Sequence, residues 1–320
     1  MIYKDSYVKD NIEGAKTKLH LFQLNDNGNS FVIQLKNGHF VVHDGGQEID
    51  GPYLLDFLEE LAPEGEKPVI EAWFISHAHG DHYGAMMNIA SELNGAKRLC
   101  VEGFYFFEPC SKVLATMASD AAGVYNTTLS FKTFRNQEGN QTPVYRPQLG
   151  QRYYFCDLSI DVCLTPEQYT LDSYYTADFN DTSIWLMHHI ENQRVLIAGD
   201  ASYTGTQIAM NLYEKDYFDL DVFSVLHHGI NVYDYFTDYC KVDTVLYTNW
   251  RLGSLYQETP EYLSARIEEN SHLQESALES YSHGNGTVVL TFPYKVGTAE
   301  IMEASDWRYN RGTPKREIPE

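Results

Sequence analysis

The sequence predicts one α/β (α+β) domain in which two mixed β-sheets pack face to face and helices cover them. Segments with strand and helix patterns alternate along 320 residues, without a linker rich in Pro, Gly or Ser. Strands come first in each half of the chain, and helices are interleaved later. A chain of this length can bury a full core. We expect a single domain over residues 1–302 and a polar tail over 303–320.

A hairpin is expected near the N-terminus. Apolar segments over 31–36 and 39–43 flank Asn37-Gly38, a dipeptide typical of tight hairpin turns. The second segment leads into Asp44-Gly45-Gly46. Taken alone, Asp-Gly-Gly indicates only a turn. We single it out because it precedes the histidine motif that is described next.

Three histidines and one aspartate fall within six residues, His77-Ala-His79-Gly-Asp81-His82. They directly follow the apolar run 69–75, which predicts a buried strand, and they precede a helical pattern over 83–93. Imidazole and carboxylate groups are the usual nitrogen and oxygen ligands of zinc and similar ions, and a catalytic site also leaves a position for water. A lone histidine is more often a satisfied polar residue, but four potential ligands on one loop predict a metal site.

Further polar motifs follow strand patterns downstream. Asn180-Asp181-Thr182-Ser183 opens a strand pair over 183–189 and 194–198, which ends in Gly199-Asp200. After a helical stretch over 205–214, an apolar strand over 222–226 ends in His227-His228-Gly229. Taken in isolation, Asp200 would be interpreted as a turn residue at a strand end. His227 and His228 would be interpreted as a hydrogen-bonded polar pair at a strand end.

The order of these motifs resembles the metallo-beta-lactamase-fold hydrolase superfamily, over roughly residues 18–292. The downstream motifs resemble the branch typified by the hydrolase-like domain of the DNA-uptake competence protein. The resemblance implies a four-layer αββα sandwich and a supporting role for Asp44 behind the metal loop. It also implies that Asp200 bridges or completes the metals and that one histidine of the His-His-Gly motif, here His227, is a ligand.

The implied centre holds one or two divalent ions, with Zn expected and Mn or Fe as alternatives. Such an ion lowers the pKa of a bound water to about 7 and so supplies an activated hydroxide. Asp81 would orient this hydroxide and receive its proton, while His228 would stabilise developing charge or protonate the leaving group. The choice between His227 and His228 as the ligand stays open. The expected ligands are His77, His79, Asp81, His82, Asp200 and His227.

One stretch departs from the superfamily's pattern. The third histidine usually follows a strand between the first motif and the aspartate, but the matching stretch, 158–168, has Thr165-Pro166-Glu167. Glu167 or Gln168 could substitute as the ligand. His188 and His189 lie near a hairpin turn, away from Asp200, and we expect both to be exposed. Weak or absent occupancy of the first metal position is therefore an alternative.

The charge of the chain constrains its substrate. With 45 acidic and 23 basic residues, the net charge is −22, which repels polyanions, and no basic stripe with interleaved aromatic residues is present. We expect a small-molecule substrate rather than a nucleic acid.

The N-terminus lacks the apolar core of a signal peptide, and no apolar run approaches the roughly 20 residues of a membrane helix. A cytoplasmic protein with no membrane partner is expected.

The expected function is that of a metal-dependent hydrolase acting on a small phosphoester, phosphodiester or related ester. A lactamase- or lactonase-like hydrolase of a cyclic amide or ester is one alternative, because the same ions would support it. A noncatalytic binding or sensing protein with a degraded metal site is the other, because the third histidine is missing.

Overall fold

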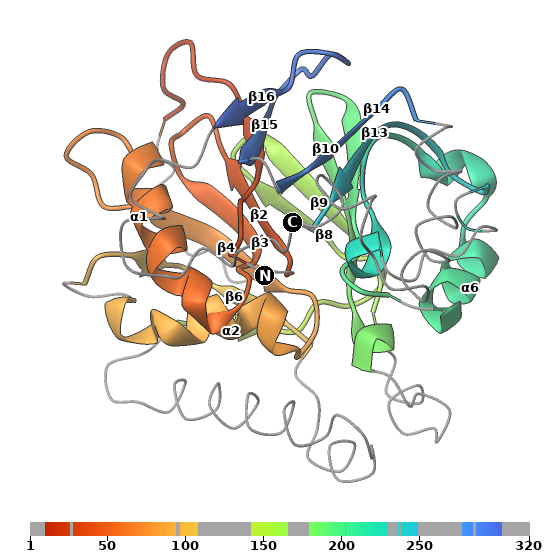
Figure 1. The fold of residues 1–320 in the computed structure, drawn as a ribbon, viewed down its shortest axis with the longest axis horizontal. Coiled ribbons are helices and arrows are strands. Elements are labelled where there is room, and N and C mark those ends of the chain that lie inside the picture. The colour runs from red at the N-terminus through yellow and green to blue at the C-terminus, as the bar shows by residue number, and fades with distance from the viewer. Residues whose placement is uncertain are drawn as a thin grey trace, which may run out of the picture.

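The computed structural model describes residues 10–25, 28–93, 97–107, 142–165, 179–201, 203–229, 236, 238–248, 277–283 and 286–302. Within these ranges the strands form two β-sheets. Figure 1 shows the sheets facing one another, with α1 and α2 outside one sheet and α6 outside the other. The predicted four-layer αββα sandwich of two mixed sheets is confirmed. The expected tail, 303–320, lies outside the described residues.

The first sheet contains nine strands among the residues that the structure describes. Their order is β16-β15-β1-β2-β3-β4-β6-β7, with β5 also beside β4. Strand β4 runs parallel to β3, β5 and β6, whereas β1, β2 and β3 are antiparallel to their neighbours in the hairpins. The strands are β1 Lys18–Leu21, β2 Ser30–Gln34, β3 Phe40–Asp44, β4 Val69–Ile75, β5 Cys100–Val101, β6 Phe104–Phe106, β7 Val144–Tyr145, β15 Thr287–Thr291 and β16 Glu300–Met302.

The second sheet has seven strands in the described part of the chain, in the order β14-β13-β12-β11-β10-β9-β8. Strands β8 to β11 are antiparallel, and β11 to β14 are parallel. The strands are β8 Arg152–Phe155, β9 Leu158–Leu164, β10 Trp185–Ile190, β11 Gln193–Ile197, β12 Asp219–Ser224, β13 Lys241–Tyr247 and β14 Glu279–Ser282.

The helices are short and lie on the outer faces. The predicted helix over 83–93 begins earlier, at Gly80, so the end of the histidine motif forms its first turn. None of the helices described is long and apolar enough to cross a membrane. The helices are α1 Gly51–Leu61, α2 Gly80–Asn88 and α6 Tyr203–Leu212, with 3₁₀ turns η1 Glu48–Asp50, η2 Ala90–Glu92, η3 Phe179–Thr182, η4 Lys215–Phe218 and η5 Leu226–Gly229.

The second sheet is buried on both of its faces. Along β10, Leu186 and Ile190 belong to the core between the sheets, while Trp185 and Met187 pack in a second core with Ala209 of α6. Successive strand residues point to opposite faces, and a sheet covered on both sides needs apolar residues on both. This double burial explains why apolar residues occur on both faces of β10.

The expectation that His188 is exposed is wrong. Its side chain is fully buried between the sheets, where its Nε2 lies 2.7 Å from Nε2 of His43 on β3. The Nδ1 of His188 donates to the carbonyl oxygen of Val195 at 3.1 Å, so its Nε2 accepts the hydrogen bond from His43. Burial lowers the pKa of His188 to about 4 and that of His43 well below its usual value. His189 points outward and pairs with Asp161 at 3.0 Å.

The carboxyl ends of several strands from both sheets deliver polar residues to one edge of the sandwich. Strand β3 ends in Asp44, and β4 is followed by Ser76. In the second sheet, β11 leads to Asp200 and β12 leads to η5. Parallel neighbours place their carboxyl ends at the same edge of a sheet. The backbone N–H of Ile184 donates to Ser76 O at 3.1 Å and connects the two sheets there.

Candidate metal centre

The loop between β4 and α2 carries the first group of polar side chains. Strand β4 ends at Ile75, and α2 begins at Gly80 with His79 as its N-cap residue. His82, in the first turn of α2, is completely buried, whereas the Asp81 side chain keeps 30% of its surface exposed. The loop thus presents a buried imidazole beside an accessible carboxylate.

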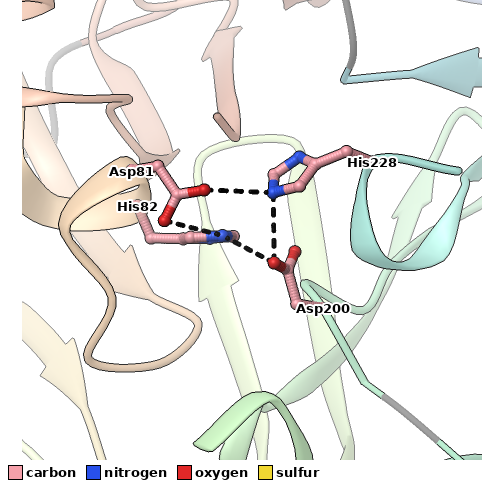
Figure 2. Close-up of side chains that lie close together, drawn as sticks. All are labelled: Asp81, His82, Asp200 and His228. Atoms are coloured by element: carbon pink, nitrogen blue, oxygen red, sulfur yellow. Dashed lines mark ion pairs between the residues drawn. The ribbon is translucent and has the colours of Figure 1, made fainter. Parts of the chain in front are cut away.

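Four side chains from three loops converge on one point, as Figure 2 shows. The ligand atoms of Asp81, His82, Asp200 and His228 all lie within 4.8 Å of one another. Oδ2 of Asp200 lies 3.2 Å from Nε2 of His82 and 3.1 Å from Nε2 of His228. Asp81 closes the ring at 3.3 Å from His228 Nε2 and 3.9 Å from His82 Nε2. We call these four residues the cation cluster.

The cation cluster fits a divalent ion. Its donors are two imidazole nitrogens and two carboxylates, a set that suits Zn, Mn or Fe. Within the described structure, the buried Nε2 atoms of His82 and His228 lack the geometry of a hydrogen bond, although each faces a carboxylate. Buried nitrogens are normally hydrogen-bonded or bound to a metal. An ion among the four groups would satisfy both.

The charges within the cation cluster balance one another. Burial disfavours the charged form of His228, but the Asp200 carboxylate raises the pKa of His228 to about 9. Burial opposes protonation of His82 as well, and Asp200 and Asp44 nevertheless raise the pKa of His82 well above its usual value. Burial also opposes ionisation of Asp200, yet His228 and His82 hold its pKa well below the usual range. A divalent ion would take the place of the protons on these imidazoles.

Asp44 fixes the orientation of His82 from behind. Its Oδ2 lies 2.9 Å from Nδ1 of His82, so that Nε2 of the same ring faces the cation cluster. Oδ1 accepts a 2.7 Å hydrogen bond from the backbone N–H of Ser76. The Trp73 indole donates to the backbone oxygen of Asp44 at 2.8 Å. Carboxylates in this position lock the tautomer and the ring plane of a metal-binding histidine.

Asn29 connects the Asp-Gly-Gly turn to the metal loop. Its Nδ2 donates to Oδ2 of Asp44 at 2.6 Å, and its backbone N–H donates to the backbone oxygen of Asp81 at 3.1 Å. Its carbonyl oxygen accepts from the N–H groups of Gly45 and Gly46, both at 3.0 Å. Asn29 therefore connects the turn at 44–46 with the loop that carries Asp81, and it holds the two in the relative position that the cation cluster requires.

His77 and His79 form a hydrogen-bonded pair beside the cation cluster. Nε2 of His77 lies 2.8 Å from Nδ1 of His79. The Nδ1 of His77 faces the hydroxyls of Ser76 at 3.1 Å and Ser183 at 3.2 Å. Burial, and then the neighbouring His82, lowers the pKa of His77 well below its usual value. This ring is therefore neutral, the form in which imidazole binds metals.

The structure places all seven site residues predicted from the sequence at one edge, but it does not bring them all equally close. Asp81, His82 and Asp200 meet, and His228 joins them. His227 Nε2 lies 3.9 Å from Oδ2 of Asp200. Thr165, where the third histidine was sought, is buried at the end of β9, and Glu167 and Gln168 lie outside the described residues.

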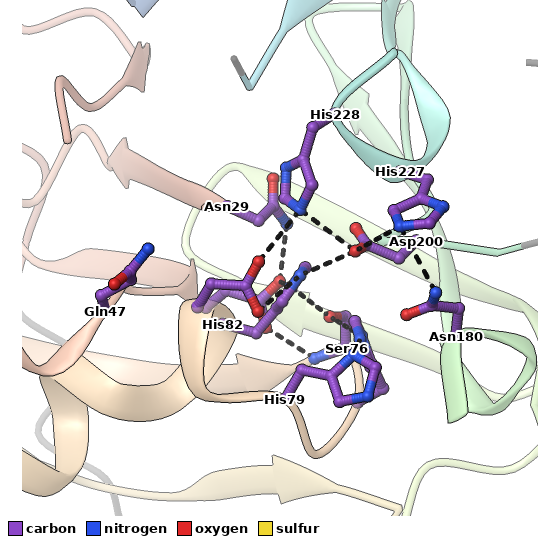
Figure 3. Close-up of polar contacts among 12 residues, drawn as sticks. Asn29, Gln47, Ser76, His79, His82, Asn180, Asp200, His227 and His228 are labelled. Atoms are coloured by element: carbon purple, nitrogen blue, oxygen red, sulfur yellow. Dashed lines mark hydrogen bonds and ion pairs between the residues drawn. The ribbon is translucent and has the colours of Figure 1, made fainter. Parts of the chain in front are cut away.

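Several residues that position the site were not among the site residues predicted from the sequence. Nδ1 of His228 lies 2.9 Å from the hydroxyl of Thr248, and the hydroxyl of Ser183 accepts from the backbone N–H of Asp200 at 3.1 Å. Asn180 lies against His227 (Figure 3). The only signal for Asn180 and Ser183 was the polar motif 180–183 before a strand. Asn29 and Thr248 are single polar residues with no spacing pattern.

A family model of the metallo-beta-lactamase superfamily matches residues 25–232. The chain belongs to this superfamily. Among solved structures, the chain is similar to unliganded yeast PDE1, with a TM-score of 0.50, 8% identity and coverage of 84% of this chain and 98% of that one. It is similar to the metallo-beta-lactamase fold protein YhfI from Bacillus subtilis, with a TM-score of 0.48, 10% identity and coverage of 87% and 100%.

The chain is also similar to CmlA, a diiron beta-hydroxylase from Streptomyces venezuelae. The TM-score is 0.49 at 12% identity, and the match covers 87% of this chain and 54% of that one. At 8% identity, the likeness to yeast PDE1 shows the fold alone. No curated protein sequence matches the chain significantly.

Replacing Asn29 with Ala will loosen the metal centre of this superfamily member. We expect a loss of about 1–3 kcal/mol in the free energy of unfolding, because the buried Asp44 carboxylate loses a charge-assisted hydrogen bond. Metal affinity should fall by roughly tenfold or more, because His82 loses its support. Urea unfolding of the metal-free protein and a competitive chelator titration measure the two effects.

The matched control is Asn211→Ala, at an exposed position on α6. It should change neither quantity. Equal metal affinity in Asn29→Ala and the unmodified protein would contradict the role assigned to Asn29.

Proposed function

We propose that this protein is a metal-dependent hydrolase that acts on a small phosphoester or phosphodiester. The observation that carries the proposal is the convergence of Asp81, His82, Asp200 and His228 on one point at the carboxyl ends of strands from both sheets. These four residues would hold a divalent ion, with Zn as our first choice. When bound, such an ion activates water as a nucleophile and polarises the substrate oxygen that it faces.

Asp81 is the residue we assign to the attacking water. It is the exposed member of the cation cluster, with 30% of its side chain accessible, while Asp200 and His228 are buried. Burial raises the pKa of Asp81, but His82 and His228 more than offset this and lower it below the usual value. The carboxylate is therefore ionised and can accept a hydrogen bond from a water molecule that enters from solvent.

We assign His228 to the cation and not to proton transfer. Its Nε2 lies within 3.3 Å of carboxylate oxygens of both Asp81 and Asp200. Thr248 fixes the opposite side of the ring by its 2.9 Å contact with Nδ1. Both ring nitrogens of His228 therefore face other protein groups, and neither is placed to protonate a leaving group.

The charge of the chain supports a small substrate. The motif order of 180–229 resembles a branch typified by a DNA-uptake protein, but a net charge of −22 opposes binding of a long polyanion. A small diester carries one negative charge, which the cation can neutralise. We place the protein in the cytoplasm as part of this proposal.

The test is turnover of a chromogenic phosphodiester, bis(p-nitrophenyl) phosphate, by metal-loaded protein. Asp81→Asn should reduce kcat/KM by at least about a hundredfold, because it removes both a ligand charge and the group that orients water. Glu60→Gln, at an exposed carboxylate of α1, should retain full activity. Metal content and circular dichroism of each variant are measured alongside.

Parallel assays with a chromogenic lactam and a lactone separate the alternatives. Turnover confined to a cyclic amide or ester, and lost in Asp81→Asn, would replace the phosphodiester proposal with a lactamase- or lactonase-like activity. Metal-loaded protein with no activity above the Asp81→Asn background on any of the three would overturn the proposal in favour of a binding or sensing role.

A further inference from the structure

Two adjacent histidines, His227 and His228, lie in η5 between the carboxyl ends of two strands. The backbone N–H of His227 donates to Gly199 O at 3.2 Å, just beyond the end of β11. On the other side, the backbone N–H of Val225 donates to the carbonyl oxygen of Leu246 in β13 at 2.9 Å. The segment that carries both histidines is therefore fastened to β11 and to β13.

The backbone of η5 gives the two rings separate surroundings. Both histidines have left-handed conformations, with φ of 48° at His227 and 55° at His228. This region is unfavourable for residues other than glycine, so contacts with the surrounding structure must hold it. Each histidine can be asked in turn which groups its ring nitrogens face.

Thr248 directly follows β13 and contacts the His228 ring. Its hydroxyl lies 2.9 Å from Nδ1 of His228, and the residue is only 2% exposed. The opposite nitrogen, Nε2, lies 3.1 Å from Oδ2 of Asp200 and 3.3 Å from Oδ2 of Asp81. A histidine that binds an ion through Nε2 keeps its proton on Nδ1, so the partner of Nδ1 must be an acceptor. The buried Thr248 hydroxyl is an acceptor in that position.

The His227 ring meets a donor instead. The side-chain amide nitrogen of Asn180 lies 3.4 Å from Nε2 of His227. An amide nitrogen only donates, so Nε2 of His227 accepts this hydrogen bond and directs its lone pair to Asn180. The same Nε2 lies 3.9 Å from Oδ2 of Asp200, farther than the Nε2 of His228. Figure 3 shows Asn180 below the His227 ring and His228 on the other side of Asp200.

We propose that Thr248 is the positioning residue that assigns His228, and not His227, to the cation. By accepting from Nδ1, its hydroxyl directs Nε2 of His228 into the cation cluster, whereas Asn180 keeps Nε2 of His227 engaged. Thr248 acts only through His228. This inference rests on the proposed metal-dependent function and deepens it, because it names the residue that selects one ligand from two adjacent histidines.

The test is the Zn²⁺ affinity of the full-length protein, measured by competition with a chromogenic chelator. Thr248→Val keeps the shape of the side chain but removes the acceptor, so Zn²⁺ binding should weaken by roughly ten- to a hundredfold. Thr248→Ser restores the hydroxyl and should recover most of the affinity. The matched control is Thr244→Val on the same strand, where the buried hydroxyl donates to Oε1 of Glu279 at 2.8 Å. It should leave the Zn²⁺ affinity unchanged.

A second measurement uses the unmodified protein and so does not depend on the folding of a variant. Long-range ¹H–¹⁵N correlation spectra of the Zn²⁺-loaded protein should show His228 protonated on Nδ1 and coordinated through Nε2. They should show no coordinated nitrogen on His227. Zn²⁺ bound to His227, or to Nδ1 of His228, would overturn the inference.

The variants can also contradict the inference. Undiminished Zn²⁺ affinity in Thr248→Val, or an equal loss in Thr248→Val and Thr248→Ser, would show that the hydroxyl does not position His228. Failure of the proposed function looks different, because the expected affinities and spectra would then occur without turnover of bis(p-nitrophenyl) phosphate. A protein that binds no Zn²⁺ would overturn both.

Discussion

Asp44→Asn will lower the free energy of unfolding by about 3 kcal/mol and weaken metal binding by roughly ten- to a hundredfold. The Asp44 carboxylate is completely buried and accepts from Asn29 at 2.6 Å, Ser76 N at 2.7 Å and His82 at 2.9 Å. An amide in its place turns one acceptor into a donor that faces another donor. It also removes the negative charge that holds His82 in position.

Asp44→Asn removes the carboxylate without adding backbone strain. Asp44 has a φ of 55°, a conformation that Asn adopts readily and Ala does not. Urea unfolding of metal-free protein and competition with a chromogenic chelator measure the two quantities. The matched control, Asp216→Asn, changes an exposed carboxylate near α6 and should leave both unchanged. Unaltered metal affinity in folded Asp44→Asn would refute the supporting role.

Local sequence signals predicted most of the strands around the metal centre. The run 69–75 coincides with β4, and the Asn37-Gly38 turn joins β2 to β3 as expected. These segments are apolar because both faces of their sheets are covered, and their turns carry residues that accept positive φ. Gly38 has a φ of 82°. Such signals lie within a few residues of one another, so they can be recognised without knowledge of the fold.

The division of roles between His227 and His228 could not be predicted in the same way. It depends on two left-handed backbone angles in η5, and because both positions are histidine, the residue type does not distinguish them. The position of Asn29 depends on contacts with residues 15 and 52 positions away in the sequence. A contact between distant residues leaves no local pattern. The sequence could therefore predict the ligand types and the strand ends that carry them, but not the residues that hold them in register.

The burial of His188 shows the same limit. Its place near the hairpin turn at 191–192 predicted exposure, yet the facing sheet covers this end of β10. A histidine can be buried there because His43 on the opposite sheet satisfies its second nitrogen. Sheet-to-sheet pairing of two polar residues is a property of the assembled sandwich and not of either strand.

The buried histidines will make the metal-free protein lose stability as pH falls from 6.5 toward 4. Burial lowers the pKa of His20 and of His188 to about 4, each from 6.5. Between these values the unfolded chain binds protons that the folded chain does not, so the stability is present above pH 6.5 and lost below it. A shift of this size is worth about 3 kcal/mol for each residue. Urea unfolding at pH 6.5 and pH 4 measures the loss.

The double variant His43→Leu/His188→Leu tests the cause. It removes two of the buried imidazoles between the sheets, so the loss between pH 6.5 and pH 4 should shrink by about 3 kcal/mol or more. His189→Leu, which changes the outward-facing neighbour, should retain the full loss. The cation cluster acts in the opposite sense, because the pKa of His228 is raised to about 9 and its stabilisation is lost only as pH rises through that value. An acid loss of equal size in the double variant would show that the buried pair of His43 and His188 does not contribute to unfolding in acid.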